Sequence, residues 1–139
     1  MPRFKFRMQK LLEYRHLQEK WAKDEYLARR AKRIEGEQQI ELVKETRVEA
    51  LKVRYQSLDE RRAQEQYVSR LDEEQRAFES AVAVLAGEEE SAKQEWIGRR
   101  QQAKAFDKLR DNALDEWQTE ENRREQAELD DWSVMRRAA

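Results

Sequence analysis

The sequence lacks proline from Arg3 onward and contains only three glycines, Gly36, Gly87 and Gly98. Proline has no amide hydrogen to donate and clashes with the preceding helical turn, and glycine weakens a helix by about 1 kcal/mol. Because both residues are nearly absent, few positions force a helix to stop. The sequence therefore predicts long helices.

Charged residues make up 42% of the chain and hydrophobic residues only 38%, which is too polar for a thick hydrophobic core. Such compositions are typical of disordered chains and of coiled coils, which differ in whether apolar residues recur at helical spacing. We expect an all-α coiled coil, because apolar residues keep a seven-residue frame over two stretches. These stretches are Val48, Leu51, Tyr55 and Leu58, followed by Tyr67, Leu71, Phe78, Ala81 and Leu85.

The apolar frame is less regular in the first third of the chain. Leu17, Trp21 and Ala28 share one register, whereas Leu27 and Ile34 favour the adjoining one, so we expect an irregular coil. Aromatic residues on such a stripe generally pack in a core. We therefore predict burial of three of the four tryptophans: Trp21, Trp96 and Trp117.

The charges are distributed unevenly along the chain. Residues 1–34 hold eleven basic and four acidic residues, whereas residues 107–131 hold ten acidic and four basic residues. An antiparallel return would bring the basic start and the acidic finish to the same end, which favours a hairpin over a straight rod. Exposed ion pairs contribute only about 0 to 1 kcal/mol each, so this asymmetry sets orientation and partner choice more than stability.

Two segments are candidates for the turn of the hairpin. Ser57 and Asp59 can cap a helix with their short side chains, and they lie near the centre of the chain. Gly87, which precedes three glutamates, is the rival, but a turn there would make the helices badly unequal. We predict one coiled-coil domain over residues 1–139, with a turn near residues 56–66. The expected elements are a first helix at 1–56, a tip at 57–66 and a second helix at 67–137 whose end projects alone.

The sequence contains no motif for catalysis or for a cofactor. His16 is the single histidine, no cysteine is present and no glycine-rich phosphate loop occurs, so we expect no catalytic, metal or cofactor-binding residues. We interpret the acidic runs Glu88–Glu90 and Asp130–Asp131 as solvated charge, because they lack the spacing of a calcium loop. No apolar run suits a signal peptide or a membrane span, so we expect a cytoplasmic protein that does not insert into the membrane.

Four segments resemble the flagellar export protein family FliJ. The first carries an aromatic pair, Phe4 and Phe6, ahead of a stretch that reads Arg-Met-Gln-Lys-Leu-Leu-Glu-Tyr-Arg. An aromatic-led middle stretch, a basic-aromatic stretch and an acidic ending follow in the family's order. Together the segments span nearly the whole chain, at residues 4–15, 66–72, 104–110 and 125–131.

The resemblance implies a two-helix antiparallel coiled coil that serves as the central stalk of the type III export ATPase. Members of this family are not themselves catalysts. They bind the hexameric flagellar ATPase FliI and promote its ring assembly, engage the export gate protein FlhA and interact with export chaperones. The resemblance thus implies a cytoplasmic protein that is peripheral to the inner membrane at the flagellar export apparatus.

The resemblance also indicates residues for two partner surfaces. For the export gate these are Tyr67 and Leu71, then Leu51 and Tyr55, although the same four residues would equally suit a seam packed near the turn. The tip is shorter than is common in the family. For the ATPase ring we expect the joined termini, where the alternative is a solvated charged face. The residues are Arg3, Lys5, Arg7, Lys10 and Arg15 at one end, meeting Arg123, Arg124, Asp130, Asp131 and Trp132 at the other.

Two other classes of function remain alternatives at this stage. One is the equivalent stalk of a virulence-type secretion system, or a generic adaptor coiled coil, which only a partner would distinguish. The other is nucleic-acid binding through Arg29, Arg30, Lys32 and Arg33. The net charge of −1 and the lack of a nucleic-acid-binding module speak against it, so we expect no nucleic-acid partner.

Overall fold

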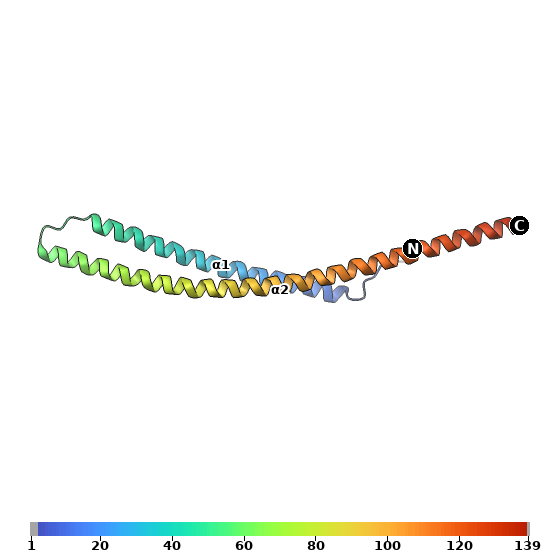
Figure 1. Cartoon of the computed structure of the whole chain (residues 1–139), viewed down its shortest axis with the longest axis horizontal. Coiled ribbons are helices and arrows are strands. Elements are labelled where there is room, and N and C mark those ends of the chain that lie inside the picture. Colours follow the sequence, from blue (N-terminus) through green and yellow to red (C-terminus); the bar gives the residue numbers. More distant parts are fainter. Residues whose placement is uncertain (1–2, 139) are drawn as a thin grey trace. The chain divides into compact units, whose positions relative to one another are not determined.

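The computed structural model describes residues 3–138 and contains two helices, α1 (Gln9–Lys52) and α2 (Leu58–Ala138), with no strand in that range. The predicted all-α class and the antiparallel two-helix hairpin are confirmed (Figure 1). The chain divides into two compact units. We call Trp21–Trp96 the tip unit and Met1–Lys20 with Ile97–Ala139 the terminal unit. Within each unit, α1 and α2 pack against each other.

The two helices of the tip unit are joined by residues 53–57, and Ser57 caps the start of α2. Its Oγ accepts a hydrogen bond from the Glu60 amide at 3.2 Å, and the Glu60 carboxylate accepts one from the Gln56 amide at 2.6 Å. This reciprocal arrangement closely resembles a capping box. At the end of α1, the Gln64 side-chain amide donates to the carbonyls of Ala50 and Val53 at 2.8 and 3.0 Å. Side chains thus satisfy backbone groups that a helix end leaves without partners.

These caps correct the predicted element bounds. A turn in this region is confirmed, and α2 continues through Gly87. The tip predicted at 57–66 is wrong, because Ser57 already caps α2 and residues 58–66 are helical. The first helix also begins at Gln9 and ends at Lys52, instead of spanning 1–56.

The seam between the helices of the tip unit follows a strict alternation of three- and four-residue steps. Its residues are buried or half-buried, and they repeat every seven residues on both helices. On α1 they are Ala22, Tyr26, Arg29, Arg33, Gly36, Ile40, Val43, Arg47 and Ala50. On α2 they are Gln64, Val68, Leu71, Gln75, Phe78, Val82, Leu85, Glu89, Ala92 and Trp96.

The predicted apolar frame is partly wrong. Leu71, Phe78 and Leu85 do lie in the seam, but Tyr67 and Ala81 are exposed, and Val68 and Val82 take the places expected for them. The four apolar residues of the first stretch, predicted to pack, are all about half exposed or more: Val48, Leu51, Tyr55 and Leu58. Val48 and Leu51 face outward because the preceding residues, Arg47 and Ala50, take the seam positions. Tyr55 lies in the connection between the helices and Leu58 is the first residue of α2.

The terminal unit continues the same step pattern. Leu12 of α1 and Ala103 of α2 are buried, at 7% and 1% exposure, and Phe106 is half-buried on the same line. Residues 3–8 precede α1, and the ring of Phe4 lies 5.9 Å from that of Trp117 in a tilted contact. This contact shows how the segment before α1 still covers α2.

The tryptophans only partly follow the prediction of burial. Trp96 is half-buried and its ring stacks on Tyr26 at 5.6 Å, and Trp117 is half-buried under Phe4. Trp21 is 55% exposed, so its predicted burial is wrong. It lies on α1 one position before the seam residue Ala22, on the side away from α2.

Gly36 lies at a seam position where the helices approach closely. A Cβ atom added there would lie 2.8 Å from Cγ2 of Val82, which is closer than carbon atoms pack. Val82 is β-branched and short, so its methyl group has little freedom to withdraw. Apart from the adjacent residues and backbone of α2 itself, no heavy atom lies within 4 Å of a Cβ placed on Gly87 or on Gly98.

We predict that Gly36→Ala destabilises the protein by about 1 to 2 kcal/mol, because overpacking against Val82 exceeds the gain in helix propensity. The matched control, Gly87→Ala, should stabilise the protein by about 1 kcal/mol, since only helix propensity changes. Urea unfolding followed by circular dichroism measures both. Adding Val82→Ala should restore much of the stability lost in Gly36→Ala. Stabilisation by Gly36→Ala alone would contradict this close approach.

Candidate partner-binding surfaces

Arginines of α1 and carboxylates of α2 form ion pairs across the seam of the tip unit. Arg33 pairs with Glu89, and its Nη1 also donates to Glu37 at 2.9 Å. The Arg33 and Glu89 side chains are only 24% and 13% exposed. Arg47 Nε donates to Asp72 Oδ1 at 2.7 Å, nearer the turn. Arg33, Arg47 and Glu89 take seam positions that apolar residues occupy in a regular coiled coil.

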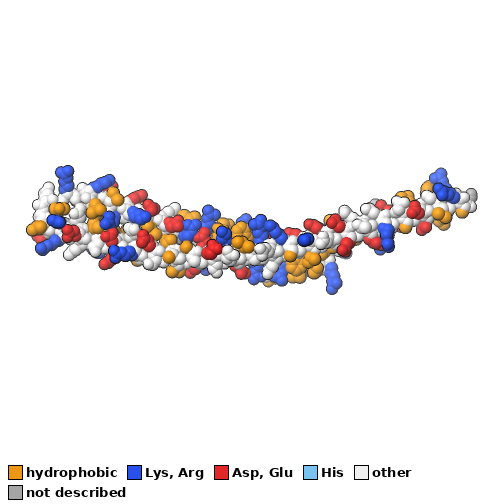
Figure 2. Space-filling view, viewed as in Figure 1, with side chains coloured by type: hydrophobic (Ala, Val, Ile, Leu, Met, Phe, Trp, Pro, Cys, Tyr) orange, Lys and Arg blue, Asp and Glu red, His pale blue; other side chains and the backbone are white. Residues whose placement is uncertain are grey.

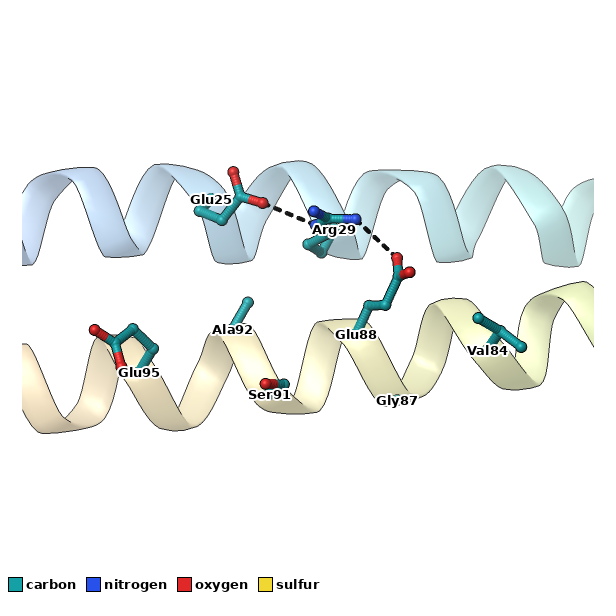
Figure 3. A pocket seen from close by; sticks show the side chains of 8 residues that line it. All are labelled: Glu25, Arg29, Val84, Gly87, Glu88, Ser91, Ala92 and Glu95. Atoms are coloured by element: carbon teal, nitrogen blue, oxygen red, sulfur yellow. Dashed lines mark hydrogen bonds and ion pairs between the residues drawn. The ribbon is translucent and has the colours of Figure 1, made fainter.

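Arg29 forms the neighbouring crossing between the helices. Its guanidinium donates to Glu25 on its own helix and to Glu88 on α2, both at 2.8 Å (Figure 3). The hydrogen bond to Glu25 is the largest contribution that raises the pKa of Arg29, and the hydrogen bond to Glu89 does the same for the pKa of Arg33. Beside this crossing lies an open groove of about 670 Å³ that includes Val84, Gly87 and Glu95.

These pairs correct one interpretation of the sequence in part. Glu89 is half-buried and paired with Arg33, because the antiparallel return places α1 beside it, whereas Glu88 pairs with Arg29 and remains exposed. In the terminal unit, His16 is half-buried with Nε2 2.7 Å from Asp107 Oδ1. These interactions join residues far apart in the sequence, so the composition of the chain gave no sign of them.

The turn end of the tip unit presents apolar side chains to solvent. Leu51, Tyr55 and Tyr67, three of the residues predicted for the export gate, are 52%, 49% and 41% exposed. The fourth, Leu71, is only 6% exposed and packs in the seam, so its side chain is not part of this surface. Leu58, which the sequence had assigned to the seam, is 70% exposed. The exposed set, Leu51, Tyr55, Leu58 and Tyr67, is called the tip surface below.

Arginines flank the aromatic rings of the tip surface. The guanidinium carbon of Arg61 lies 5.6 Å from the Tyr55 ring centre, and that of Arg70 lies 5.9 Å from the Tyr67 ring centre. Cation–π contacts at exposed sites contribute about 0.5 to 1 kcal/mol each. A groove of about 220 Å³ beside them is lined by residues that include Leu51, Gln64 and Val68. The tip therefore offers apolar area with a polar rim.

The start of the chain forms a second surface, within the terminal unit. Arg3, Lys5, Arg7 and Lys10 are exposed, and Arg15 is half-buried with Nη1 3.2 Å from Gln102 Oε1. The guanidinium of Arg110 covers Phe4 at 5.7 Å and donates to Gln9 at 3.3 Å. An open cleft of about 600 Å³ lies here, with Phe4 and Phe6 among its apolar walls and Lys5, Arg7 and Lys10 among its cations.

The meeting of the two termini stays a prediction for these side chains. Residues 3–10 contact α2 around Arg110 and Trp117, and every residue from 122 to 138 is exposed. The residues predicted to complete the ATPase surface follow Trp117 along α2: Arg123, Arg124, Asp130, Asp131 and Trp132.

The exposed end of α2 carries its own apolar residues. Leu129, Trp132 and Met135 are 58%, 57% and 73% exposed, and the Arg136 guanidinium lies 5.0 Å from the Trp132 ring centre. Arg123 and Arg124 pair with glutamates one turn earlier on the same helix. This segment is thus a single amphipathic helix with no second helix against it in the described residues.

The seam arginines are the residues that sequence reasoning missed. The arginines lie at the three- and four-residue steps of the seam between Ala22 and Ala50. A pattern search that considers only apolar residues omits them and therefore assigns the seam to the adjoining register. A search of the sequence for two helices that place opposite charges at facing seam positions would have found this register, because Arg33 and Glu89 are both seam residues and form an ion pair.

The fold and these surfaces define a protein of the coiled-coil class, a helical hairpin with exposed apolar and charged patches. The family model described as flagellar FliJ protein matches residues 4–139, nearly the whole chain. The chain therefore belongs to the FliJ family, and it is a protein of the flagellar export apparatus and of type III secretion. Neither the curated proteins nor the solved structures contain a significant match.

Between residues 3 and 138, neither helix has a stretch that is both long and apolar enough to span a membrane. The hydrophobic side chains instead alternate with charged ones along the surface, as Figure 2 shows for one face. The surfaces described above are therefore mixed, with each apolar residue close to charged neighbours.

We predict that Arg33→Leu lowers the melting temperature, because it leaves the largely buried Glu89 carboxylate without its partner. Adding Glu89→Leu should return the melting temperature to the wild-type value or above, since two packed leucines replace the ion pair. Thermal unfolding followed by circular dichroism measures both variants. Lys44→Ala, which removes only an exposed pair with Glu41, is the control and should change little. If the single and double variants melt alike, Arg33 and Glu89 are not coupled.

Proposed function

We propose that this protein is a non-enzymatic stalk and adaptor of the flagellar type III export apparatus. In this role it binds the export ATPase FliI, promotes the assembly and activity of its hexameric ring, and couples the ring to the export gate protein FlhA and to export chaperones. The observation that carries the proposal is the FliJ family match over residues 4–139, together with the two-helix hairpin. The protein would act on the cytoplasmic side, peripheral to the membrane.

The physical character of the surface supports a role through contacts. The described residues include only four buried hydrophobic residues, so most side chains remain available to partners: Leu12, Val43, Leu71 and Ala103 are the buried ones. Charged side chains surround the apolar ones. Exposed charges at an interface raise the association rate, orient the partners and make binding depend on salt, but they add less to the affinity. Such a surface suits a rod that touches several subunits of a ring.

For the ATPase, the start of the chain and the exposed end of α2 are two separate candidate contacts. The first combines the cations Arg3, Lys5 and Arg7 with an apolar cleft, and the second presents Trp132 among charged residues. We propose that each of the two groups contributes to the binding of the ring.

We predict that Arg3, Lys5 and Arg7 together replaced by Glu weaken stimulation of the ATPase. The concentration for half-maximal stimulation should rise about tenfold, since three favourable charge contacts become unfavourable. Steady-state ATP hydrolysis and ring assembly of FliI, with and without this protein, provide the measurement. The matched control reverses three exposed arginines of the tip unit, Arg54, Arg62 and Arg76, and should stimulate normally. Equal loss in both variants would contradict a specific contact at the start of the chain.

For the export gate, we propose the tip surface. Its aromatic residues Tyr55 and Tyr67 are exposed, lie within one unit and are supported by neighbouring arginines. Tyrosine gives a large apolar contact area together with a polar hydroxyl, which is why it is enriched where interfaces concentrate their binding energy.

We predict that Tyr55→Ala with Tyr67→Ala weakens binding to the cytoplasmic part of FlhA by about tenfold or more, as expected for the loss of exposed aromatic anchors. Isothermal titration calorimetry measures the affinity. Val84→Ala, which trims another exposed apolar side chain of the tip unit, is the control and should bind normally. Unchanged affinity of the double variant would place the gate contact elsewhere.

A further inference from the structure

The exposed end of α2 carries four residues that lie on one face of the helix. Every residue of α2 from 122 to 138 is exposed, and no other helix of the described chain lies beside it (Figure 1). Along this segment, Glu125, Leu129, Trp132 and Arg136 follow one another at steps of four, three and four residues. Steps of this kind place side chains on one face, as in the seam of a coiled coil. We call these four residues the end stripe.

The end stripe is not the continuation of the seam with α1. Beyond Trp117, the three- and four-residue steps of the seam pass through Arg124, Ala127 and Asp131, which are polar or small. The large apolar side chains lie instead on the end stripe, where Leu129 and Trp132 are 58% and 57% exposed. Exposed apolar side chains that gather on one face, instead of standing singly, mark an interaction surface.

The charged residues at the two ends of the stripe have no ion-pair partner in the described chain. Glu125 and Arg136 form no ion pair with another described residue, whereas the neighbouring Arg124 pairs with Glu120 and Glu121. The end stripe thus begins with an unpaired carboxylate, continues with two apolar side chains and ends with an unpaired guanidinium. A partner that fits it must offer the opposite charges at its two ends.

The same stripe in a second copy offers those charges when the copy runs in the opposite direction. Glu125 and Arg136 lie equally far from the midpoint between residues 130 and 131, and so do Leu129 and Trp132. An antiparallel copy centred there sets Glu125 against Arg136 at both ends and Leu129 against Trp132 twice in the middle. A parallel copy would set like charges against each other. The charges thus select a second copy in the antiparallel direction.

The other charges of the segment do not oppose this arrangement. Asp130 and Asp131 project to the sides of the helix away from the end stripe, since each residue turns the helix by about 100°. Antiparallel helices bring the same flank of each together, which sets Glu128 beside Met135 of the second copy. No two like charges therefore face each other across the contact.

We propose that two copies of this protein associate through their end stripes, antiparallel about the midpoint between residues 130 and 131. The interface is isologous, so each copy contributes the same surface. It extends from Glu125 to Arg136, about 17 Å along each helix, and such a short contact gives a weak dimer with a dissociation constant on the order of 100 µM. This self-association does not depend on the proposed stalk function, although it covers Trp132, which is also a candidate contact for the ring.

The first test is the mass of the whole protein in solution, measured by sedimentation equilibrium from about 10 µM to about 1 mM, which brackets the expected constant. We expect a concentration-dependent species of twice the 16.9 kDa chain mass. Leu129→Glu with Trp132→Glu should be a monomer of unchanged helicity. The matched control is Val134→Glu, at a 64% exposed position on the opposite side of the same segment, and it should still dimerise. A wild-type protein that stays monomeric over the whole range, or a control that dissociates as fully as the double variant, overturns the proposal.

A charge exchange tests the direction of pairing. Glu125→Arg sets two cations together at each end of an antiparallel contact, and Arg136→Glu sets two carboxylates together, so each change should weaken the dimer about tenfold. Both changes in one chain restore opposite charges and should return the affinity to the wild-type value. In a parallel pair, like charges face each other in the wild type and in all three variants, so the affinity would not change. Equal affinity throughout, or a double variant no tighter than the single ones, would overturn the antiparallel arrangement.

Disulfide crosslinking gives an independent result, because the chain has no cysteine. A mixture of Glu125→Cys and Arg136→Cys proteins should form a mixed disulfide under mild oxidation. Each protein alone should crosslink poorly, since the two identical positions lie about 16 Å apart along an antiparallel pair. A parallel pair would instead crosslink each variant with itself, which would contradict the proposal. Val134→Cys, on the opposite side of the helix, is the control for random collision and should remain unlinked in the same time.

Discussion

The structure depends on matching the arginines in the seam of α1 with carboxylates of α2. A guanidinium held between two helices is costly unless a carboxylate meets it, and here Arg33 meets Glu89 while Arg29 and Arg47 meet Glu88 and Asp72. These pairs fit the register in which the two helices pack. Once that register is set, Gly36 must lie against Val82, and neighbouring apolar residues such as Leu42 must face solvent.

The same constraint explains how a hairpin with a thin core presents several distinct surfaces. Polar residues take part of the seam, so apolar residues are left over for the tip surface, for the outer face of α1 and for the exposed end of α2. In a member of the FliJ family, which works in the flagellar export apparatus, contact with partners is the expected use of such surfaces. The ion pairs thus determine both how the helices align and which side chains are free to bind.

The sequence predicted the fold better than it predicted the surfaces. The scarcity of proline and glycine and the opposite charges at the two ends led to the antiparallel hairpin, but the second helix was predicted to begin at residue 67, whereas Ser57 already caps α2. The seam of α1 was assigned to the wrong register, because Val48 and Leu51 are more hydrophobic than Arg47 and Ala50. Leu71 was predicted both as a seam residue and as a gate contact, and its burial supports only the first interpretation.

The sequence by itself determined the long helices, the position of the turn to within a few residues and the family, because helix propensity, capping and family motifs are properties of neighbouring residues. Only the tertiary structure decided which face of α1 turns inward. It placed Arg33 beside Glu89 and His16 beside Asp107, residues that lie 56 and 91 positions apart in the sequence. No local pattern contains such a pair, since it exists only after the antiparallel return has placed the two helices side by side.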